Sequence, residues 1–88
     1  MYHVYLLRSK ISYRKFYIGF TSRKINERIK DHNYGAVGAT KLYRPWSLIY
    51  LETYVSESDA RKREKMLKQY GSSLGQLKKR LFDTLNKD

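Results

Sequence analysis

The sequence contains no cysteine, so the chain can build no disulfide, no thiolate metal site and no cysteine nucleophile. Its two histidines, His3 and His32, are far apart and fit no zinc-binding spacing. No apolar run is long enough to cross a membrane, and charges follow rather than precede the short run at the amino terminus. We therefore expect neither a membrane span nor a leader peptide, no membrane partner, and a soluble protein of the cytoplasm.

Acidic residues are scarce: eight Asp and Glu stand against nineteen Lys and Arg, for a net charge of +11. The excess is concentrated in residues 1–44, where ten basic residues face only Glu27 and Asp31. Such a distribution is the electrostatic footprint of a polyanion partner. Solubility alone is the plain alternative. An anionic membrane surface ranks third, because no strongly amphipathic basic helix is visible. The composition favours nucleic acid.

The length and patterning predict one small domain over residues 1–88. Residues 2–8 and 15–20 are rich in β-branched and aromatic residues and predict a hairpin. A helix capped by Thr21 or Ser22 should run to about residue 33, and a strand should begin at Trp46. Two further helices complete the order ββαβαα, an α+β domain built on a small sheet.

Period-two alternation assigns the faces of the hairpin. One face should carry Val4, Leu6, Phe16, Ile18 and Phe20, and the other Tyr5, Tyr17 and Gly19. A glycine within a strand often marks close approach by another group.

The next helix should open at Ser56, with Asp59 completing a capping box, and end at Gly71 as a C′ residue. Its inward positions are Ala60, Leu67 and Tyr70. The final helix should present Leu74, Leu77, Leu81 and Leu85 on one face, and this leucine face should close the domain's own core. An adaptor function that uses it to bind a partner is a third possibility.

Glu64 is the only acid that helical periodicity places inward, between Ala60 and Leu67. Burying an unpaired carboxylate is costly, so it needs a cation, a metal or hydrogen bonds. Magnesium takes one or two protein carboxylates and keeps several waters, so a single glutamate suffices for one ion. The plain alternative is a salt bridge to Arg63, Lys65 or Lys68.

Arg28 and His32 are four residues apart and share a helix face. Arg28 could hold a phosphate through two parallel hydrogen bonds, or could simply pair with Asp31. His32 could assist the leaving oxygen, or could be a helix-end histidine bonded to a loop. Tyr5 and Tyr17 could stack on bases, or one could act as a base if cations such as Arg28 lower its pKa.

These residues resemble the GIY-YIG nuclease superfamily. The likeness rests on Val4-Tyr5, Tyr17-Ile18-Gly19, Arg28 and His32-Asn33 in a helix, and Glu64 in a later one, and it spans residues 2 to about 70. The small single-domain UPF0213 type is the nearest likeness, and the nuclease domains of UvrC and of phage homing endonucleases are more distant. Three features depart from the pattern: His3 stands for glycine, the interval from Tyr17 to Arg28 is one residue wider, and Phe20 stands where some relatives have lysine.

The resemblance implies a three-stranded antiparallel sheet flanked by helices and hydrolysis of phosphodiesters with one divalent ion, Mg²⁺ or Mn²⁺. It makes Glu64 the metal ligand and places Tyr5, Tyr17, Arg28 and His32 around the scissile phosphate, with Tyr5 favoured as the residue that assists the attacking water. Gly19 and the cations Arg23, Lys24, Lys41 and Arg44 are the expected nucleic-acid contacts.

The resulting hypothesis is a metal-dependent endonuclease of weak sequence specificity, acting on DNA rather than RNA, with DNA repair or recombination as its expected setting. A protein partner could supply specificity, because no recognition element fitted to a groove is evident. The alternative is a non-catalytic basic module that binds nucleic acid.

Overall fold

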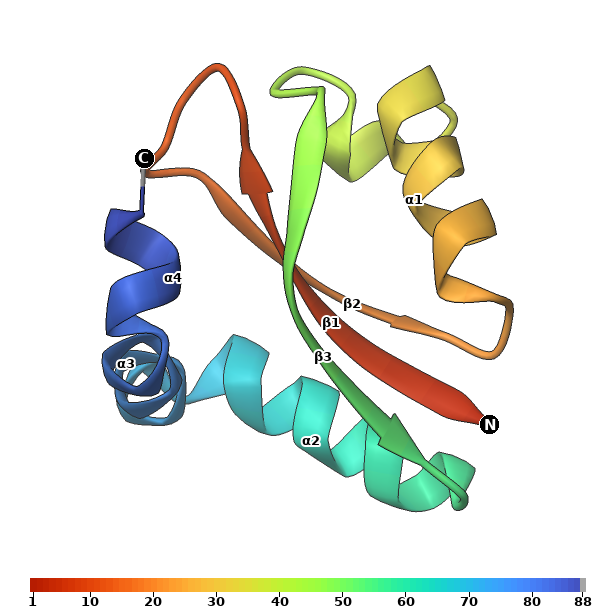
Figure 1. Cartoon of the computed structure of the whole chain (residues 1–88). Coiled ribbons are helices and arrows are strands. Elements are labelled where there is room, and N and C mark those ends of the chain that lie inside the picture. The colour runs from red at the N-terminus through yellow and green to blue at the C-terminus, as the bar shows by residue number, and fades with distance from the viewer. Residues whose placement is uncertain (88) are drawn as a thin grey trace.

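A computed structural model describes residues 1–87 of the chain. Three strands form one antiparallel sheet: β1 (Tyr2–Ser9), β2 (Phe16–Thr21) and β3 (Trp46–Tyr54), in the order β2-β1-β3. The helices are α1 (Ile25–Tyr34), α2 (Glu57–Gln69), α3 (Gly71–Arg80) and α4 (Phe82–Asn86), with a short 3₁₀ turn, η1 (Gly38–Thr40), before β3. Figure 1 shows α1 and α2 on opposite sides of the sheet. The expected α+β class and three-stranded sheet are confirmed.

Alternating side chains of the strands pack in two separate hydrophobic cores, one on each face of the sheet. The face toward α2 and α3 buries Val4, Leu6 and Ile18 together with Ala60, Leu67 and Leu77. The face toward α1 buries Tyr5, Leu7 and Trp46, with Tyr17, Ile25 and Ile29 packed against them. The period-two prediction for the hairpin is therefore confirmed, and the leucine face after residue 73 does close the core.

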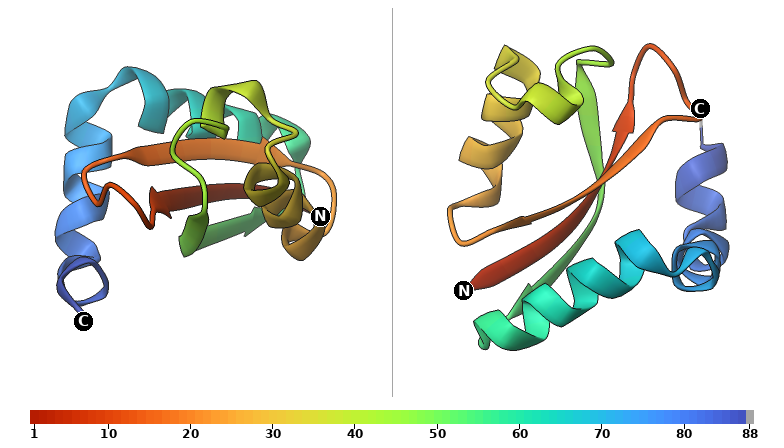
Figure 2. Two further views of the ribbon diagram at one scale, coloured as in Figure 1. Left: turned by 90° about the horizontal axis from the view of Figure 1, so that it is seen from above. Right: turned by 180° about the vertical axis from the view of Figure 1, so that it is seen from behind.

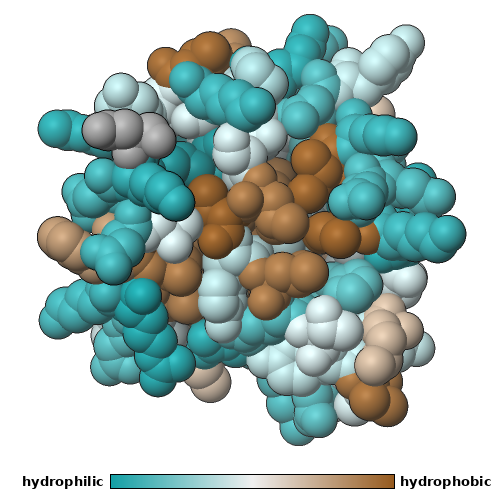
Figure 3. Space-filling view, viewed as in Figure 1, coloured by the Kyte–Doolittle hydropathy of each residue, from teal (hydrophilic) through white to brown (hydrophobic). Residues whose placement is uncertain are grey.

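β3 contains an irregularity that alternation alone does not predict. Its register against β1 passes from Leu6↔Tyr50 to Leu7↔Leu48, which leaves Ile49 as an extra residue in a β-bulge. Ile49 and Tyr50 are consecutive, yet both pack against the α2-side core. Figure 3 shows an apolar patch over β3 that is rimmed by hydrophilic side chains. Two leucines of β3, Leu48 and Leu51, are 37% and 38% exposed.

Several predicted helix boundaries are wrong. α1 begins at Ile25 with Lys24 as N-cap, because the Thr21 hydroxyl instead accepts a hydrogen bond from the Arg23 amide in a local turn. α2 does begin after Ser56, whose hydroxyl accepts from the Asp59 amide at 3.3 Å. α2 ends at Gln69, so Tyr70 lies between two helices and is 59% exposed rather than inward.

Gly71 does not end α2 in a left-handed conformation. Within residues 1–87 the only positive-φ residue is Gly35, and Gly71 is the first residue of α3. The single expected final helix is broken at Leu81 into α3 and α4. None of the helices within residues 1–87 has the length and apolar character needed to cross a bilayer. Figure 2 shows the packing of these helices from two further directions.

Candidate active site

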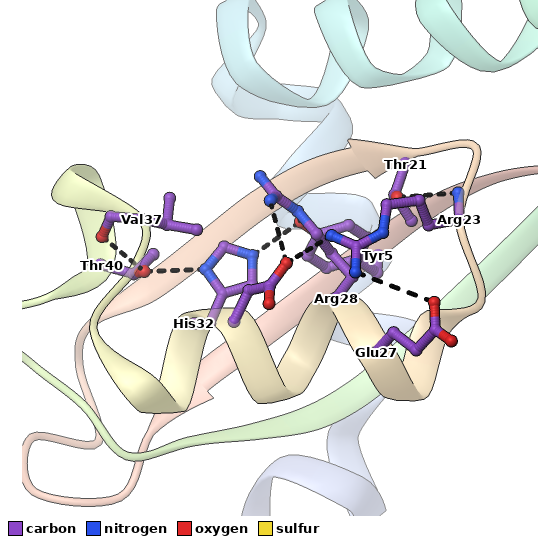
Figure 4. A network of polar contacts seen from close by, with 9 residues as sticks. Tyr5, Thr21, Arg23, Glu27, Arg28, His32, Val37 and Thr40 are labelled. Carbon is purple, nitrogen blue, oxygen red and sulfur yellow. Dashed lines mark hydrogen bonds and ion pairs between the residues drawn. The ribbon is translucent and has the colours of Figure 1, made fainter.

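The Tyr5 hydroxyl is the hub of a buried polar network between β1 and α1. Tyr5 is 1% exposed, and its ring crosses Gly19, its partner in the β1–β2 register. A Cβ at Gly19 would lie 2.2 Å from the tyrosine ring, so only glycine fits there. The hydroxyl lies 2.7 Å from Nε2 of His32 and accepts a hydrogen bond from Nε of Arg28 at 3.3 Å. Figure 4 shows these three side chains converging.

His32 lies behind Tyr5 and is completely buried, at 0% exposure. Its Nδ1 is 2.7 Å from the Thr40 hydroxyl, which donates to the Val37 carbonyl at 3.3 Å. Because that hydroxyl gives its proton to Val37, it accepts one from Nδ1, which leaves Nε2 free to accept the proton of Tyr5. Burial, with a contribution from the nearby Arg28 charge, lowers the pKa of His32 to about 4. His32 is therefore neutral at physiological pH, with its Nε2 directed at the Tyr5 hydroxyl.

The loop after α1 fixes the far end of this network. Oδ1 of Asn33 accepts a hydrogen bond from the Trp46 amide at 2.6 Å, and Nδ2 of Asn33 donates one to the Trp46 carbonyl at 3.2 Å. The two bonds connect the end of α1 to the start of β3. The Trp46 indole donates to the Thr40 carbonyl at 2.8 Å. Thr40, which is 0% exposed, is thus held from its side chain and its backbone. Thr40 is not among the residues predicted from the sequence, because a loop residue carries no periodic signal.

Burial decides the acidity of Tyr5. Loss of solvent raises the pKa of the Tyr5 hydroxyl above its usual value, and Tyr17 and Glu64 add to the rise. The hydrogen bond and charge of Arg28 lower that pKa, as the sequence suggested, but they do not outweigh burial. The resting protein therefore holds Tyr5 as a phenol whose proton points at His32.

Arg28 pairs with Asp31, as considered for it, and also contacts Tyr5. Its Nε bonds Tyr5, and its Nη1 lies 3.8 Å from Oδ2 of Asp31. The side chain remains 27% exposed. It can therefore present N–H groups to an anion without leaving the tyrosine.

Tyr17 stands beside Tyr5 on the same face of the sheet. Its ring is 5.2 Å from that of His32 and 6.5 Å from that of Trp46, centroid to centroid. Within residues 1–87 its hydroxyl has no hydrogen-bond partner, in contrast to the hydroxyl of Tyr5. Tyr17 is only partly buried, so its hydroxyl is available to a ligand.

Glu64 approaches the same place from α2. Its side chain is 19% exposed, and Oε2 lies 3.1 Å from Nζ of Lys68, one helical turn on. Lys68 in turn lies 5.5 Å above the ring of Tyr17, which ties the Glu64–Lys68 pair to the tyrosines. The structure thus shows the inward position and the salt bridge together.

The site fits only a divalent ion that takes one protein carboxylate and otherwise keeps its waters. Residues 1–87 contain no group of three or more acidic, histidine or cysteine side chains able to cage an ion. Glu64 offers a single, partly exposed carboxylate with one oxygen not engaged by Lys68. That donor set suits magnesium or manganese, which keep several waters beside one carboxylate, and excludes a tightly caged ion.

The other predicted contact residues lie at the two ends of α1. Arg23, which pairs with Glu27 and Asp31, and the exposed N-cap Lys24 precede its first turn. Lys41 and Arg44 follow its last turn and line an open pocket with Gly38 and Leu42. Arg44 lies over Gly35, the residue after the helix.

Glu52 forms a second acidic centre that the sequence analysis missed. Its side chain, 13% exposed, is more enclosed than that of Glu64 and receives a two-pronged contact from Arg63, with Nε–Oε1 at 2.9 Å and Nη2–Oε2 at 3.0 Å. Tyr50 and Tyr54 also donate to it. These donors lower the pKa of Glu52 despite its burial, so it is a satisfied ion pair of the α2-side core.

Comparison with known proteins matches residues 1–82 to the GIY-YIG catalytic domain. A UPF0213 protein of Staphylococcus epidermidis is 45% identical over 56 residues, which cover 61% of this chain and 66% of that protein. A UPF0213 protein of Staphylococcus aureus is 41% identical over 63 residues, which cover 69% of this chain and 74% of that protein. The first match thus spans slightly under two thirds of the relative's own length.

Proposed function

Because the chain belongs to the GIY-YIG family of nucleases, we propose that it is a metal-dependent endonuclease that hydrolyses phosphodiester bonds of DNA. The observation that carries the proposal is the Tyr5 hydroxyl, which is held between Arg28 and His32 directly over Gly19. Weak sequence preference, a role in repair or recombination, a specificity-giving protein partner and a cytoplasmic location belong to the same proposal.

Tyr5 would accept the proton of the attacking water. Its own proton points at Nε2 of His32, and its oxygen accepts from Arg28, so one lone pair of that oxygen has no partner among the described residues. Since the pKa of Tyr5 is raised and that of His32 is lowered, no phenolate rests in the free protein. The tyrosine proton would pass to His32 only as the proton of the water reaches the tyrosine oxygen. The oxygen of that water would bond to phosphorus as the bond between phosphorus and the leaving oxygen breaks.

Arg28 and Tyr17 would bind the phosphate. The guanidinium can donate two hydrogen bonds to phosphate oxygens and offset the charge that grows in the transition state. Tyr17 can donate its free hydroxyl to a neighbouring oxygen. Glu64 would hold one Mg²⁺ or Mn²⁺, which when bound supplies a Lewis acid for the leaving oxygen.

The test is cleavage of supercoiled plasmid and of a labelled single strand with Mg²⁺ or Mn²⁺. Wild type, Glu64→Ala and a matched control, Glu57→Ala, would be purified side by side. Glu57 lies on the same helix, is 53% exposed and pairs only with Arg61 among the described residues. Cleavage by wild type and by the control alone would support the enzyme and the role of Glu64.

Other outcomes separate the alternatives. Equal cleavage by Glu64→Ala would overturn the metal-ligand assignment. Binding without cleavage by any of the three would favour the non-catalytic module, and cleavage confined to an RNA strand would replace DNA as the substrate.

A further inference from the structure

Edge strand β2 carries a row of cations seated on aromatic rings. Arg61 of α2 places its guanidinium carbon 4.0 Å from the centroid of the Phe20 ring. Lys78 of α3 places Nζ 4.1 Å from that of Phe16. Nζ of Lys68 lies 5.5 Å from the centroid of the Tyr17 ring. We call Arg61, Lys68 and Lys78 the β2 row. β2 is the nearest strand in the rear view of Figure 2.

The rings of Phe20 and Phe16 hold Arg61 and Lys78 without neutralising them, whereas Lys68 also pairs with Glu64. A carboxylate partner would cancel the charge, whereas an aromatic face attracts a cation through its quadrupole and carries no net charge. Lys78 has no acidic partner within residues 1–87. Among the described residues Arg61 pairs only with the exposed Glu57, and its side chain remains 58% exposed. The row is therefore positioned in advance for an anion from outside.

The row passes through the candidate active site. Lys68 contacts both Tyr17 and Glu64, while Arg61 and Lys78 lie over Phe20 and Phe16, whose rings belong to the opposite face of the same strand. Phe16 and Phe20 are four residues apart, about 13 Å along a strand. That length is enough for more than one phosphate of a nucleic-acid backbone.

We propose that the phosphodiester backbone of the substrate follows the outer edge of β2, with its phosphates contacted by Arg61, Lys68 and Lys78. This path rests on the proposed function for the identity of the ligand and adds the surface that binds it. It brings a central phosphate to Tyr17 and Glu64. The path differs from the contacts expected from the sequence, because Arg23, Lys24, Lys41 and Arg44 lie at the two ends of α1 instead.

Neighbouring lysines provide matched controls. Lys62 follows Arg61 by one residue, about 100° round the helix, and lines the pocket of Glu52 on the other flank of α2. Lys79 follows Lys78 in the same way and is exposed. Arg61→Gln and Lys78→Gln would be compared with Lys62→Gln and Lys79→Gln, each of which removes one positive charge from the same helix turn.

Binding to a fluorescent strand, single and duplexed, would be measured without divalent metal over a range of salt, so that cleavage plays no part. Each β2-row variant should reduce the slope of log K against log salt by about 0.7–0.9, the loss of one phosphate contact, and the controls should not. A thermal unfolding curve would verify that each variant is folded.

Equal slopes for row variants and controls would overturn the path while leaving nucleic-acid binding in place. A wild-type protein that binds neither form of the strand would overturn the proposed function as well. The two failures are thus distinguished by the wild-type curve.

Discussion

Replacing Gly19 by alanine tests how closely the active site is built around one ring. The added Cβ would lie 2.2 Å from Cζ of Tyr5 and 2.3 Å from its hydroxyl oxygen, where ordinary contacts begin near 3.4 Å. The ring must therefore shift by about an ångström. Tyr5 is 1% exposed, so it has no open space into which to move.

The shift has two costs. It breaks the 2.7 Å hydrogen bond to His32 and leaves a buried nitrogen unpaired, at about 1–3 kcal/mol. It also forces the packed core apart, at about 1–3 kcal/mol. We expect the free energy of unfolding to fall by about 2–6 kcal/mol in total, which for a domain of this size lowers Tm by at least roughly 10 °C.

Urea unfolding followed by fluorescence measures this directly, because the single tryptophan, Trp46, is 4% exposed in the same cluster as Tyr5. Gly75→Ala is the control: a Cβ there meets no atom within 4 Å, and alanine in a helix should stabilise by up to about 1 kcal/mol. A Gly19→Ala protein within about 0.5 kcal/mol of wild type would refute the close packing of Tyr5 on Gly19.

The remaining predictions concern the same network. Tyr5→Phe should abolish cleavage and lower the free energy of unfolding by about 1–3 kcal/mol, because His32 loses a buried partner; an active, equally stable variant would remove Tyr5 from the mechanism. Lys68→Met should raise the affinity for Mn²⁺ several-fold, measured by electron paramagnetic resonance, because Lys68 no longer competes for Glu64; unchanged affinity in Lys68→Met and in Glu64→Gln would place the metal elsewhere. The pKa of His32, about 4 against an ordinary 6.5, means that the unfolded chain binds more protons between these values, so the stability due to neutral His32 is full above pH 6.5 and is lost as the pH falls toward 4. The difference in stability between wild type and His32→Gln should therefore shrink by about 2–3 kcal/mol from pH 7 to pH 4.5, with His3→Gln as the control, and a constant difference would contradict it.

Local patterns predicted the faces of the sheet and the inward side of α2. Alternation separated Val4 and Leu6 from Tyr5, and helical spacing placed Glu64 beside Ala60. These signals depend on neighbours within one element, so the sequence contains them. The helix ends were harder, because Thr21 could cap a helix or close a turn, and only the path of the chain decides between the two.

The parts that the sequence did not predict depend on contacts between distant segments. Thr40 meets His32 only because Asn33 fastens the start of β3 to the end of α1. The Glu52 ion pair follows from the bulge at Ile49. After the bulge, Tyr50, Glu52 and Tyr54 alternate toward the α2-side core. Alternation from Tyr50 to Tyr54 is a signal that could have identified Glu52 as inward.

The two hydrogen bonds between Asn33 and Trp46 hold together the ends of the loop between these residues. Lengthening such a loop costs little, about 0.6 kcal/mol for each doubling, because the entropic cost of closing a loop grows only with the logarithm of its length. Leu42, at 76% exposure, marks a point on that loop that faces away from the core. The protein therefore offers a natural insertion point, where a peptide tag or a targeting module could be grafted while Thr40 and the tyrosine behind it keep their positions.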